Sequence, residues 1–349
     1  MEKSEFCPAF AANNIPIALA CSNCYAPYAG VLLRSLMDTA GSGWNYDVVI
    51  LEREISGENK RILTGMTAGR ANISVRFYNP RDFLAQVDVA GLGTEQFPLE
   101  LYFRVLAPHM LRCYERLITI DVDMLVKRDL AELFQTDLGG ACVGAVPDIF
   151  WQGFYQTDYV FAGNKMSART YFKEILNMKD PMNYVSGGLV LYDCVKYRQA
   201  LDWKSIISTA QAKRYMWLDQ CELNALLEGK ITFLDSAWNI ELAANPRSQY
   251  AVDAAPEETR RAYDRALASP AVLHWAGKPK PWVCPDVPYG GEWWCAAMQT
   301  PFVGHILARM FDELQTRREY YRGKYGQEVA VWEPAPQVNR SLGGSGERK

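Results

Sequence analysis

The chain has 349 residues, of which 49% are hydrophobic and 22% are charged, and its formal net charge is −3. This composition is typical of a globular protein that buries a large core, and it excludes an intrinsically disordered chain. The charge gives no basic surface for nucleic acid, and no apolar run approaches the roughly 18 residues that span a bilayer, so we expect neither partner in those forms.

Buried strands alternate with helices in the first half of the chain. Continuous apolar runs predict strands at 15–21, 47–51, 73–77 and 117–120. Helical periodicity predicts helices at 25–37, 56–66 and 99–112. This alternation predicts an α/β fold with a Rossmann-like, mixed but mostly parallel sheet and helices on both faces.

The second half of the chain is less regular. We predict strands at 141–146, 187–192 and 231–234, a helix at 217–227 and a further apolar run at 271–274. The aromatic-rich segment 150–164 is predicted to be irregular. Helical periodicity returns at 302–325, and the Pro, Gly and Ser content after that predicts a disordered tail. The predicted parts are a lead-in at 1–14, a main domain at 15–282, a helical extension at 283–325 and a tail at 326–349.

Two aspartates follow the fourth predicted strand directly. Asp121 and Asp123 are separated by Val122, so both carboxylates point the same way in an extended backbone. Because like charges repel each other unless a cation lies between them, the pair indicates a site for a hard divalent ion. Parallel sheets bind ligands at the carboxyl ends of their strands, where this pair stands. The alternative interpretation is a solvated acidic turn.

His274 is the candidate third ligand. It ends an apolar run and is followed by Gly277, Lys278 and Lys280. The glycine permits close backbone approach to a ligand, and the lysines supply positive charge for a diphosphate. One imidazole with two carboxylates favours Mn²⁺, with Mg²⁺ as the alternative ion. The alternative interpretation of this residue is a core histidine bonded to a backbone carbonyl.

Six sequence blocks occur in a specific order. They are ACSNCYAPY at 20–28, YFR at 102–104, LITIDVD at 117–123, SGGLVL at 186–191, WLDQ at 217–220 and HWAGKPKPW at 274–282. Together they resemble glycosyltransferase family 8, which includes bacterial lipopolysaccharide galactosyl- and glucosyltransferases and glycogenin. The resemblance implies a GT-A fold, a UDP-sugar donor, Mn²⁺ and retention of anomeric configuration.

The resemblance also implies roles for individual residues. The metal ligands are matched by Asp121, Asp123 and His274, with Val122 between the aspartates. The positions that hold the uracil, that orient the donor and that contact its sugar hydroxyls are matched by Ala20, Ser22, Tyr25, Arg104, Asp148, Ser186 and Gly187. The diphosphate position is matched by Gly277 and Lys280, and the sugar-binding and catalytic position by Asp219 and Gln220. The family usually has Asp at the Ser22 position and Asn at the Cys24 and Ser186 positions.

The residue types at the catalytic position bear on the mechanism. A covalent route requires an enzyme nucleophile, and the amide of Gln220 is a poor one, with Asp219 one residue earlier. We therefore favour a front-face, oxocarbenium-like route in which a β-phosphate oxygen helps to deprotonate the acceptor hydroxyl. Positioning and charge stabilisation by the metal and Lys280 then supply most of the catalysis.

The acceptor is expected to be a saccharide or glycolipid, as in lipopolysaccharide or surface-glycan assembly, and the transferred sugar glucose or galactose. Aromatic residues of the acceptor region, about 149–180, suit a carbohydrate platform, as do those after His274. They are Phe150, Trp151, Phe154, Tyr155, Tyr159, Trp282, Trp293 and Trp294.

The cell compartment and the competing functions follow from other features. An odd number of cysteines without a secretory signal argues against a disulfide framework, so we expect a cytoplasmic protein. Basic residues among aromatic and apolar ones at 302–325 allow peripheral contact with the inner membrane face, and a core-packing helix with a solvated face is an equal alternative. The alternative functions are a catalytically weak UDP-sugar-binding protein and a nucleotidyltransferase, which would carry a Gly-rich loop where 21–28 has no glycine.

Overall fold

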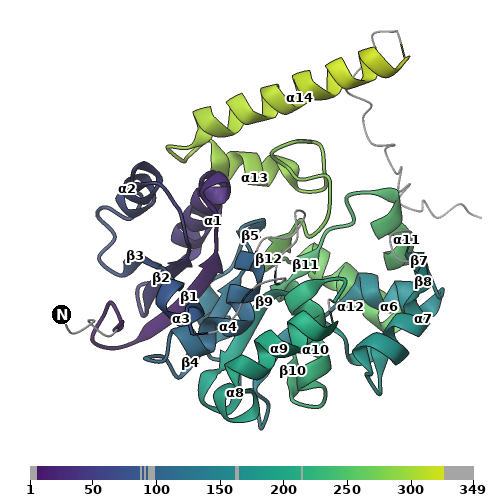
Figure 1. Cartoon of the computed structure of the whole chain (residues 1–349). Coiled ribbons are helices and arrows are strands. Elements are labelled where there is room, and N and C mark those ends of the chain that lie inside the picture. Colours follow the sequence, from purple (N-terminus) through teal and green to yellow (C-terminus); the bar gives the residue numbers. More distant parts are fainter. Residues whose placement is uncertain are drawn as a thin grey trace, which may run out of the picture.

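The computed structural model of the chain describes residues 6–86, 89, 92, 99–161, 165–213 and 215–325, with side chains described up to residue 316. Within these ranges, a seven-stranded sheet forms the centre of the molecule (Figure 1). Its strand order is β10 (Ile231–Phe233), β6 (Val143–Pro147), β9 (Val185–Asp193), β4 (Arg116–Ile120), β1 (Asn14–Ala20), β2 (Asn45–Leu51) and β3 (Ile73–Tyr78).

The sheet is mixed and mostly parallel, as predicted. β1 pairs in parallel with both β2 and β4, β2 with β3, and β10 with β6. Only β9 runs against its neighbours in the described part of this sheet, since it pairs antiparallel with β4 and β6. The residues of β1 alternate between two cores: Ile17 and Leu19 face one, and Ala18 faces the other. The first core includes α1 (Ala26–Thr39) and the second α4 (Phe103–Met110), so helices cover both faces.

The remaining described helices surround this sheet. They are α2 (Gly57–Gly65), α3 (Arg81–Leu84), α5 (Leu130–Phe134), α6 (Ile149–Gln156), α7 (Ala168–Thr170), α8 (Cys194–Ala200), α9 (Trp203–Lys213), α10 (Leu218–Leu227), α11 (Pro246–Ala254), α12 (Glu257–Ala268), α13 (Gly290–Ala297) and α14 (Val303–Tyr325). Helices α13 and α14 lie in the predicted helical extension at 283–325. Helices α3, α5, α7 to α9, α11 and α12 were not predicted from the sequence, because they are short or bury few residues each. A capping box at α11, in which Asn245 and Ser248 bond reciprocally, is the local signal that could have revealed that helix.

The prediction of an irregular segment at 150–164 is wrong where the structure describes it. Residues 149–156 form α6, and β7 (Val160–Phe161) pairs with β8 (Met166–Ser167). The rings of Trp151 and Phe154 are only 2% and 6% exposed, and they pack in a third core with Trp217, 4.4 Å from Trp151 between ring centroids. The many aromatic residues of this segment belong to this core, so the rings of Trp151 and Phe154 do not form an open carbohydrate platform. The same holds for the buried rings of Trp282 and Trp293.

A second, three-stranded sheet joins distant parts of the chain. β12 (Val272–His274) pairs in parallel with β11 (Ile240–Glu241) and antiparallel with β5 (Met124–Val126). β5 begins directly after Asp123, and its first residue, Met124, lies opposite His274. This pairing brings the histidine beside the aspartates at the end of β4.

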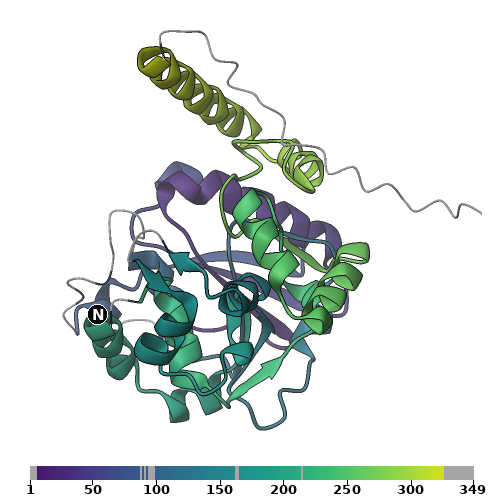
Figure 2. The same ribbon diagram turned by 90° about the vertical axis from the view of Figure 1, so that its right-hand side faces the viewer.

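The C-terminal part of the described chain leaves the main body. α13 lies beside α1, and α14 projects outward from there (Figures 1 and 2). No described helix combines the length and apolar character that crossing a bilayer requires. No disulfide joins any two of the nine cysteines, all of which lie in the described residues. The predicted tail at 326–349 lies outside the described residues.

Gly153 allows α6 and α11 to pack closely. A Cβ at this position would stand 2.6 Å from the carbonyl carbon of Ala251 and closer still to its oxygen. Because these are backbone atoms, we expect Gly153→Ala to push the helices apart and lower the free energy of unfolding by about 3 kcal/mol. Urea unfolding measures this change. Gly291→Ala on α13 is the control, because its Cβ would meet nothing within 4 Å; equal stabilities of the two variants would contradict the close packing.

His109 makes the stability of the fold dependent on pH. It is 7% exposed on α4, and burial, reinforced by Arg198, lowers the pKa of its imidazole to about 4. The unfolded chain takes up a proton below its ordinary pKa of 6.5, whereas the folded protein does not, so stability falls as the pH drops from 6.5 toward 4. We expect this residue to lower the free energy of unfolding by about 2 kcal/mol at pH 5 relative to pH 7. Urea unfolding at the two pH values measures the difference. In His109→Gln, the free energy of unfolding should change less between pH 7 and pH 5. The same change as in the wild type would show that His109 is not its cause.

Candidate active site

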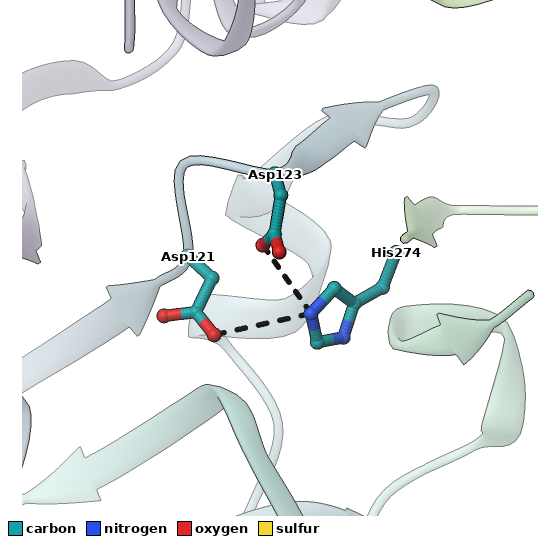
Figure 3. Close-up of side chains that lie close together, drawn as sticks. All are labelled: Asp121, Asp123 and His274. Atoms are coloured by element: carbon teal, nitrogen blue, oxygen red, sulfur yellow. Dashed lines mark ion pairs between the residues drawn. The ribbon is translucent and has the colours of Figure 1, made fainter. Parts of the chain in front are cut away.

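Three predicted metal ligands converge where β4 and β12 end (Figure 3). Nε2 of His274 lies 3.3 Å from Oδ1 of Asp123 and 3.9 Å from Oδ2 of Asp121. One ligand atom of each residue lies within 4.8 Å of those of the other two. Backbone contacts hold this arrangement: the amide of Trp275 donates to the carbonyl of Asp123 at 3.2 Å. The structure therefore brings together two oxygens and one nitrogen from segments about 150 residues apart in sequence.

Each aspartate uses one oxygen for a basic side chain and leaves the other facing His274. Asp121 pairs through Oδ1 with Arg104, and Asp123 pairs through Oδ2 with Lys280. The oxygens that face the imidazole are therefore the ones outside these ion pairs. Oδ1 of Asp123 is buried and accepts no hydrogen bond from a described group. A buried, unpaired carboxylate oxygen is costly, and a cation would relieve that cost.

The imidazole of His274 is oriented for ligation. Its Nδ1 lies 2.9 Å from Oδ1 of Asn239, a buried residue just before β11. Because an amide oxygen only accepts, Nδ1 carries the proton and donates it, which leaves the lone pair of Nε2 directed at the two aspartates. Asn239 was not among the predicted site residues. A single Asn before a two-residue strand carries no sequence signal for this role.

The two aspartates have different electrostatic surroundings. Burial raises the pKa of Asp121, and Arg104 offsets this only in part. Burial acts in the same direction on Asp123, but its charged neighbours, Lys280 foremost, outweigh it and hold its pKa well below the ordinary value. A bound divalent cation would favour the ionised form of both carboxyls.

Arg104 connects the metal-ligand cluster to α10. Its guanidinium makes a bidentate pair with Asp219, with both N–O distances at 2.9 Å, and also reaches the carbonyl of Gly187 at 3.4 Å. Arg104 and Asp219 are 7% and 2% exposed. Both carboxylate oxygens of Asp219 are therefore occupied by the arginine. Burial raises the pKa of Asp219, and the guanidinium works against that rise.

Gln220 lies against the glycine-containing end of β9. Its Oε1 accepts from the amide of Gly187 at 2.8 Å, and its Nε2 donates to Oδ2 of Asp148 at 2.9 Å. Asp148 also caps α6, since its Oδ1 accepts from the amide of Trp151 at 2.9 Å. The structure thus brings Asp148, Gly187 and Gln220 together, with Ser186 adjacent on the same strand.

The residues predicted to hold the uracil, here called the nucleotide end, lie at or just after the carboxyl end of β1. Ala20 ends this strand, Ser22 precedes a 3-10 turn at 23–25, and Tyr25 is 40% exposed. The ring of Tyr25 lies 6.3 Å from that of Trp282, measured between centroids. Trp282 follows Lys280 by two residues, so the loop after β12 links this end to the aspartates. Gly277 is exposed in the same loop.

The sequence comparison identifies the family. The model of Glycosyl transferase family 8 matches residues 16–284. The chain belongs to glycosyl transferase family 8. This membership agrees with the resemblance carried by the six sequence blocks, and it establishes the class of protein as a glycosyltransferase.

Curated relatives of this family 8 chain are distant in sequence. It is 24% identical over 270 residues to General stress protein A of Bacillus subtilis (strain 168), covering 74% of this chain and 84% of that protein. It is 25% identical over 207 residues to Lipopolysaccharide 1,2-glucosyltransferase of Escherichia coli (strain K12), covering 56% of this chain and 54% of that protein. The chain therefore spans most of the first relative and about half of the second.

Solved structures agree on the fold. The apo structure of the WbbM bifunctional glycosyltransferase matches with a TM-score of 0.79 and 28% identity, over 88% of this chain and 53% of that one. Galactosyltransferase LgtC, in complex with donor and acceptor sugar analogs, matches with a TM-score of 0.64 and 22% identity, over 82% of this chain and 96% of that one. The family 8 chain thus has the GT-A architecture predicted from its sequence.

Gly188 provides a test of the metal-ligand cluster. A Cβ at this position of β9 would stand 2.9 Å from Nδ1 of His274 and closer still to its Cε1. We expect Gly188→Ala to displace the imidazole and weaken Mn²⁺ binding by about 10- to 100-fold, the range seen when the support of a ligand is lost. Electron paramagnetic resonance of free Mn²⁺ measures the affinity. Gly144→Ala is a matched control on β6. Its Cβ would crowd the side chain of Leu138, which is not part of the metal-ligand cluster. Unchanged affinity in Gly188→Ala would argue against His274 as a ligand.

Proposed function

We propose that this family 8 protein is a metal-dependent, retaining hexosyltransferase that transfers glucose or galactose from a UDP-sugar to a saccharide or glycolipid acceptor. The observation that carries the proposal is the convergence of Asp121, Asp123 and His274, with one oxygen of each aspartate outside the ion pairs. The similarity to a lipopolysaccharide glucosyltransferase supports a role in surface-glycan assembly. Membership in a transferase family favours turnover over the binding-protein and nucleotidyltransferase alternatives.

Asp121, Asp123 and His274 would hold the divalent ion. Hard carboxylate oxygens with one imidazole suit Mn²⁺, and Mg²⁺ fits the oxygens as well. When bound, the ion supplies positive charge that stabilises the departing diphosphate. Lys280 already lies against Asp123, so its ammonium is placed to share that task on the same side of the cluster.

The donor extends from this cluster toward the end of β1. In this proposal Ala20, Ser22 and Tyr25 hold the uracil, and the diphosphate lies along the loop that carries Gly277 and Lys280. The contact between Tyr25 and Trp282 supports this direction, because it brings the same loop to the nucleotide end. The donor sugar then lies toward Arg104, Ser186 and Gly187, since Arg104 pairs with Asp121 and also reaches the carbonyl of Gly187.

The described side chains favour a front-face route for retention. The amide of Gln220 is engaged on both ends, and both oxygens of Asp219 pair with Arg104, so neither residue presents a free nucleophile. In this route the bond between the anomeric carbon and the phosphate oxygen breaks, and the acceptor oxygen bonds to the same face. The acceptor proton passes to a β-phosphate oxygen of the leaving UDP. Arg104 and Gln220 position the sugar through polar contacts.

Two further parts of the proposal concern location. We propose that the protein resides in the cytoplasm and attaches peripherally to a membrane through α14. The projection of this helix and the exposed side chain of Phe311 support the attachment. The basic side chains at 317–324 lie outside the described side chains.

The acceptor contact is better assigned to Tyr250 and Tyr159 than to the buried Trp151. Among the described rings, Tyr250 is 47% exposed and its ring centroid lies 6.3 Å from that of Tyr159.

The release of UDP tests the proposed function. With UDP-glucose or UDP-galactose and Mn²⁺, we expect slow UDP release without an acceptor, because water replaces the acceptor hydroxyl, and loss of release with EDTA. Asp123→Asn should lower the rate at least 100-fold, on the order expected when charge stabilisation is removed. Asp38→Asn is the control, since Asp38 forms only an exposed i,i+4 pair with Arg34. Binding of a UDP-sugar without UDP release would support the binding-protein alternative.

A further inference from the structure

A buried carboxyl group, Glu241, lies behind the residues that hold Gln220. It ends β11 and is 5% exposed. Its Oε1 accepts from Oγ of Ser186 at 3.0 Å, and its side chain also hydrogen bonds to Asp148. Glu241 is not part of the sequence blocks that carry the family resemblance, and the sequence analysis gave it no role.

Two buried carboxyls in contact require a proton between them. Burial, together with the charge of Asp148, raises the pKa of Glu241 well above its ordinary value. Burial raises the pKa of Asp148 to about 6, with hydrogen bonds from the amide of Trp151 and from Glu241 working against that rise. The contact is therefore a hydrogen bond in which the carboxylic acid of Glu241 donates to the carboxylate of Asp148.

These contacts form a closed ring that contains Gln220. Glu241 contacts Asp148, and Oδ2 of Asp148 accepts from Nε2 of Gln220 at 2.9 Å. Oε1 of Gln220 accepts from the amide of Gly187 at 2.8 Å. Ser186, the residue before Gly187, closes the ring through its hydroxyl to Glu241. Every link is buried or half-buried, so each hydrogen bond restricts the next one.

The ring fixes which end of the Gln220 amide faces which neighbour. Asp148 is an acceptor for Nε2 only while its carboxylate stays turned toward Gln220, and Glu241 and the amide of Trp151 are the other groups that orient this carboxylate. Without a donor at position 241, the buried carboxylate of Asp148 loses one of its hydrogen bonds, and Ser186 loses its acceptor. The cost is relieved if Asp148 turns, and Gln220 then loses its partner.

We propose that Glu241 is a positioning residue of the transfer reaction, which closes this ring and so holds the amide of Gln220 in a single orientation beside the donor sugar. The inference rests on the proposed function, and it deepens that function by assigning a residue to the support of the sugar site. Because the role needs one donor and one acceptor at position 241, a glutamine can perform it: its Nε2 donates to Asp148 and its Oε1 accepts from Ser186.

The test compares Glu241→Leu with Glu241→Gln in the full-length protein. We expect Glu241→Leu to lower kcat for UDP release from the preferred UDP-sugar at least tenfold, approaching the loss in Gln220→Ala. The Kd of UDP, from calorimetry, should change less than threefold, because the ring does not include the nucleotide end. Glu241→Gln should restore kcat to within about threefold of the wild type.

Tyr263→Phe is the matched control. The hydroxyl of Tyr263 donates to the backbone carbonyl of Glu241 at 3.0 Å, so this variant loosens the same residue without touching the ring. We expect it to lower Tm but not kcat. Where Glu241→Leu fails to fold, Glu241→Ala removes the contacts without adding an apolar side chain and replaces it in the comparison.

The outcomes separate the inference from the function on which it rests. A wild-type protein that releases UDP and a Glu241→Leu variant that does so equally well would overturn the positioning role alone. Equal loss in Glu241→Gln and Glu241→Leu would also overturn it, since the ring requires only a donor and an acceptor. Absence of UDP release from every UDP-sugar in the wild type would instead overturn the proposed function itself.

Discussion

The balance between buried carboxyl groups and basic side chains around the carboxyl end of β4 is the constraint on which the rest of the site depends. Four carboxyl groups come together there with two basic side chains, and a fifth carboxyl group is neutralised by a shared proton. These groups are Asp121, Asp123, Asp148 and Asp219, the bases Arg104 and Lys280, and the protonated Glu241. With all four carboxyls ionised, two negative charges remain, which is the charge that one divalent cation balances. The raised pKa of Asp121 shows the cost of that excess when only protein groups oppose it.

Arg104 distributes this charge between two parts of the site. Its guanidinium is buried, and it contacts Asp121 after β4, Asp219 at the start of α10 and the carbonyl of Gly187 on β9. A planar group with five donors can bond to both oxygens of Asp219 and still reach the other two elements, whereas the three donors of a lysine ammonium are too few. Asp219 thereby acts as the counter-charge that keeps the arginine in place, and Gln220, the next residue, is held beside β9.

Local patterns in the sequence predicted the main sheet, because most of its inner strands are continuous apolar runs buried on both faces. They also predicted the aspartate pair, since the spacing of Asp121 and Asp123 is fixed by the backbone between them. The approach of His274 was inferred from the glycine and lysines that follow it and from the family resemblance. Its position could not be derived from local patterns, because it depends on pairing between the short strands β5 and β12. Glu241 and Asn239 could not be predicted at all: their roles come from contacts with residues 35 or more positions away. The helix α6 was missed because its buried aromatic residues hid its periodicity.

The antiparallel strand β9 explains how the metal ligands and Gln220 are kept close but separate. Successive residues of a strand face opposite sides, and here both are glycine. A Cβ at Gly187 would stand 3.1 Å from Cβ of Gln220, and one at Gly188 would meet the imidazole of His274. Each glycine thus gives room to one functional side chain, and the backbone between them also bonds to both parts: the amide of Gly187 to Gln220 and the carbonyl of Gly188 to the amide of Asp121. The strand therefore sets the distance between the cation position and the sugar-positioning amide more rigidly than any loop would, since neither side can move without breaking the sheet.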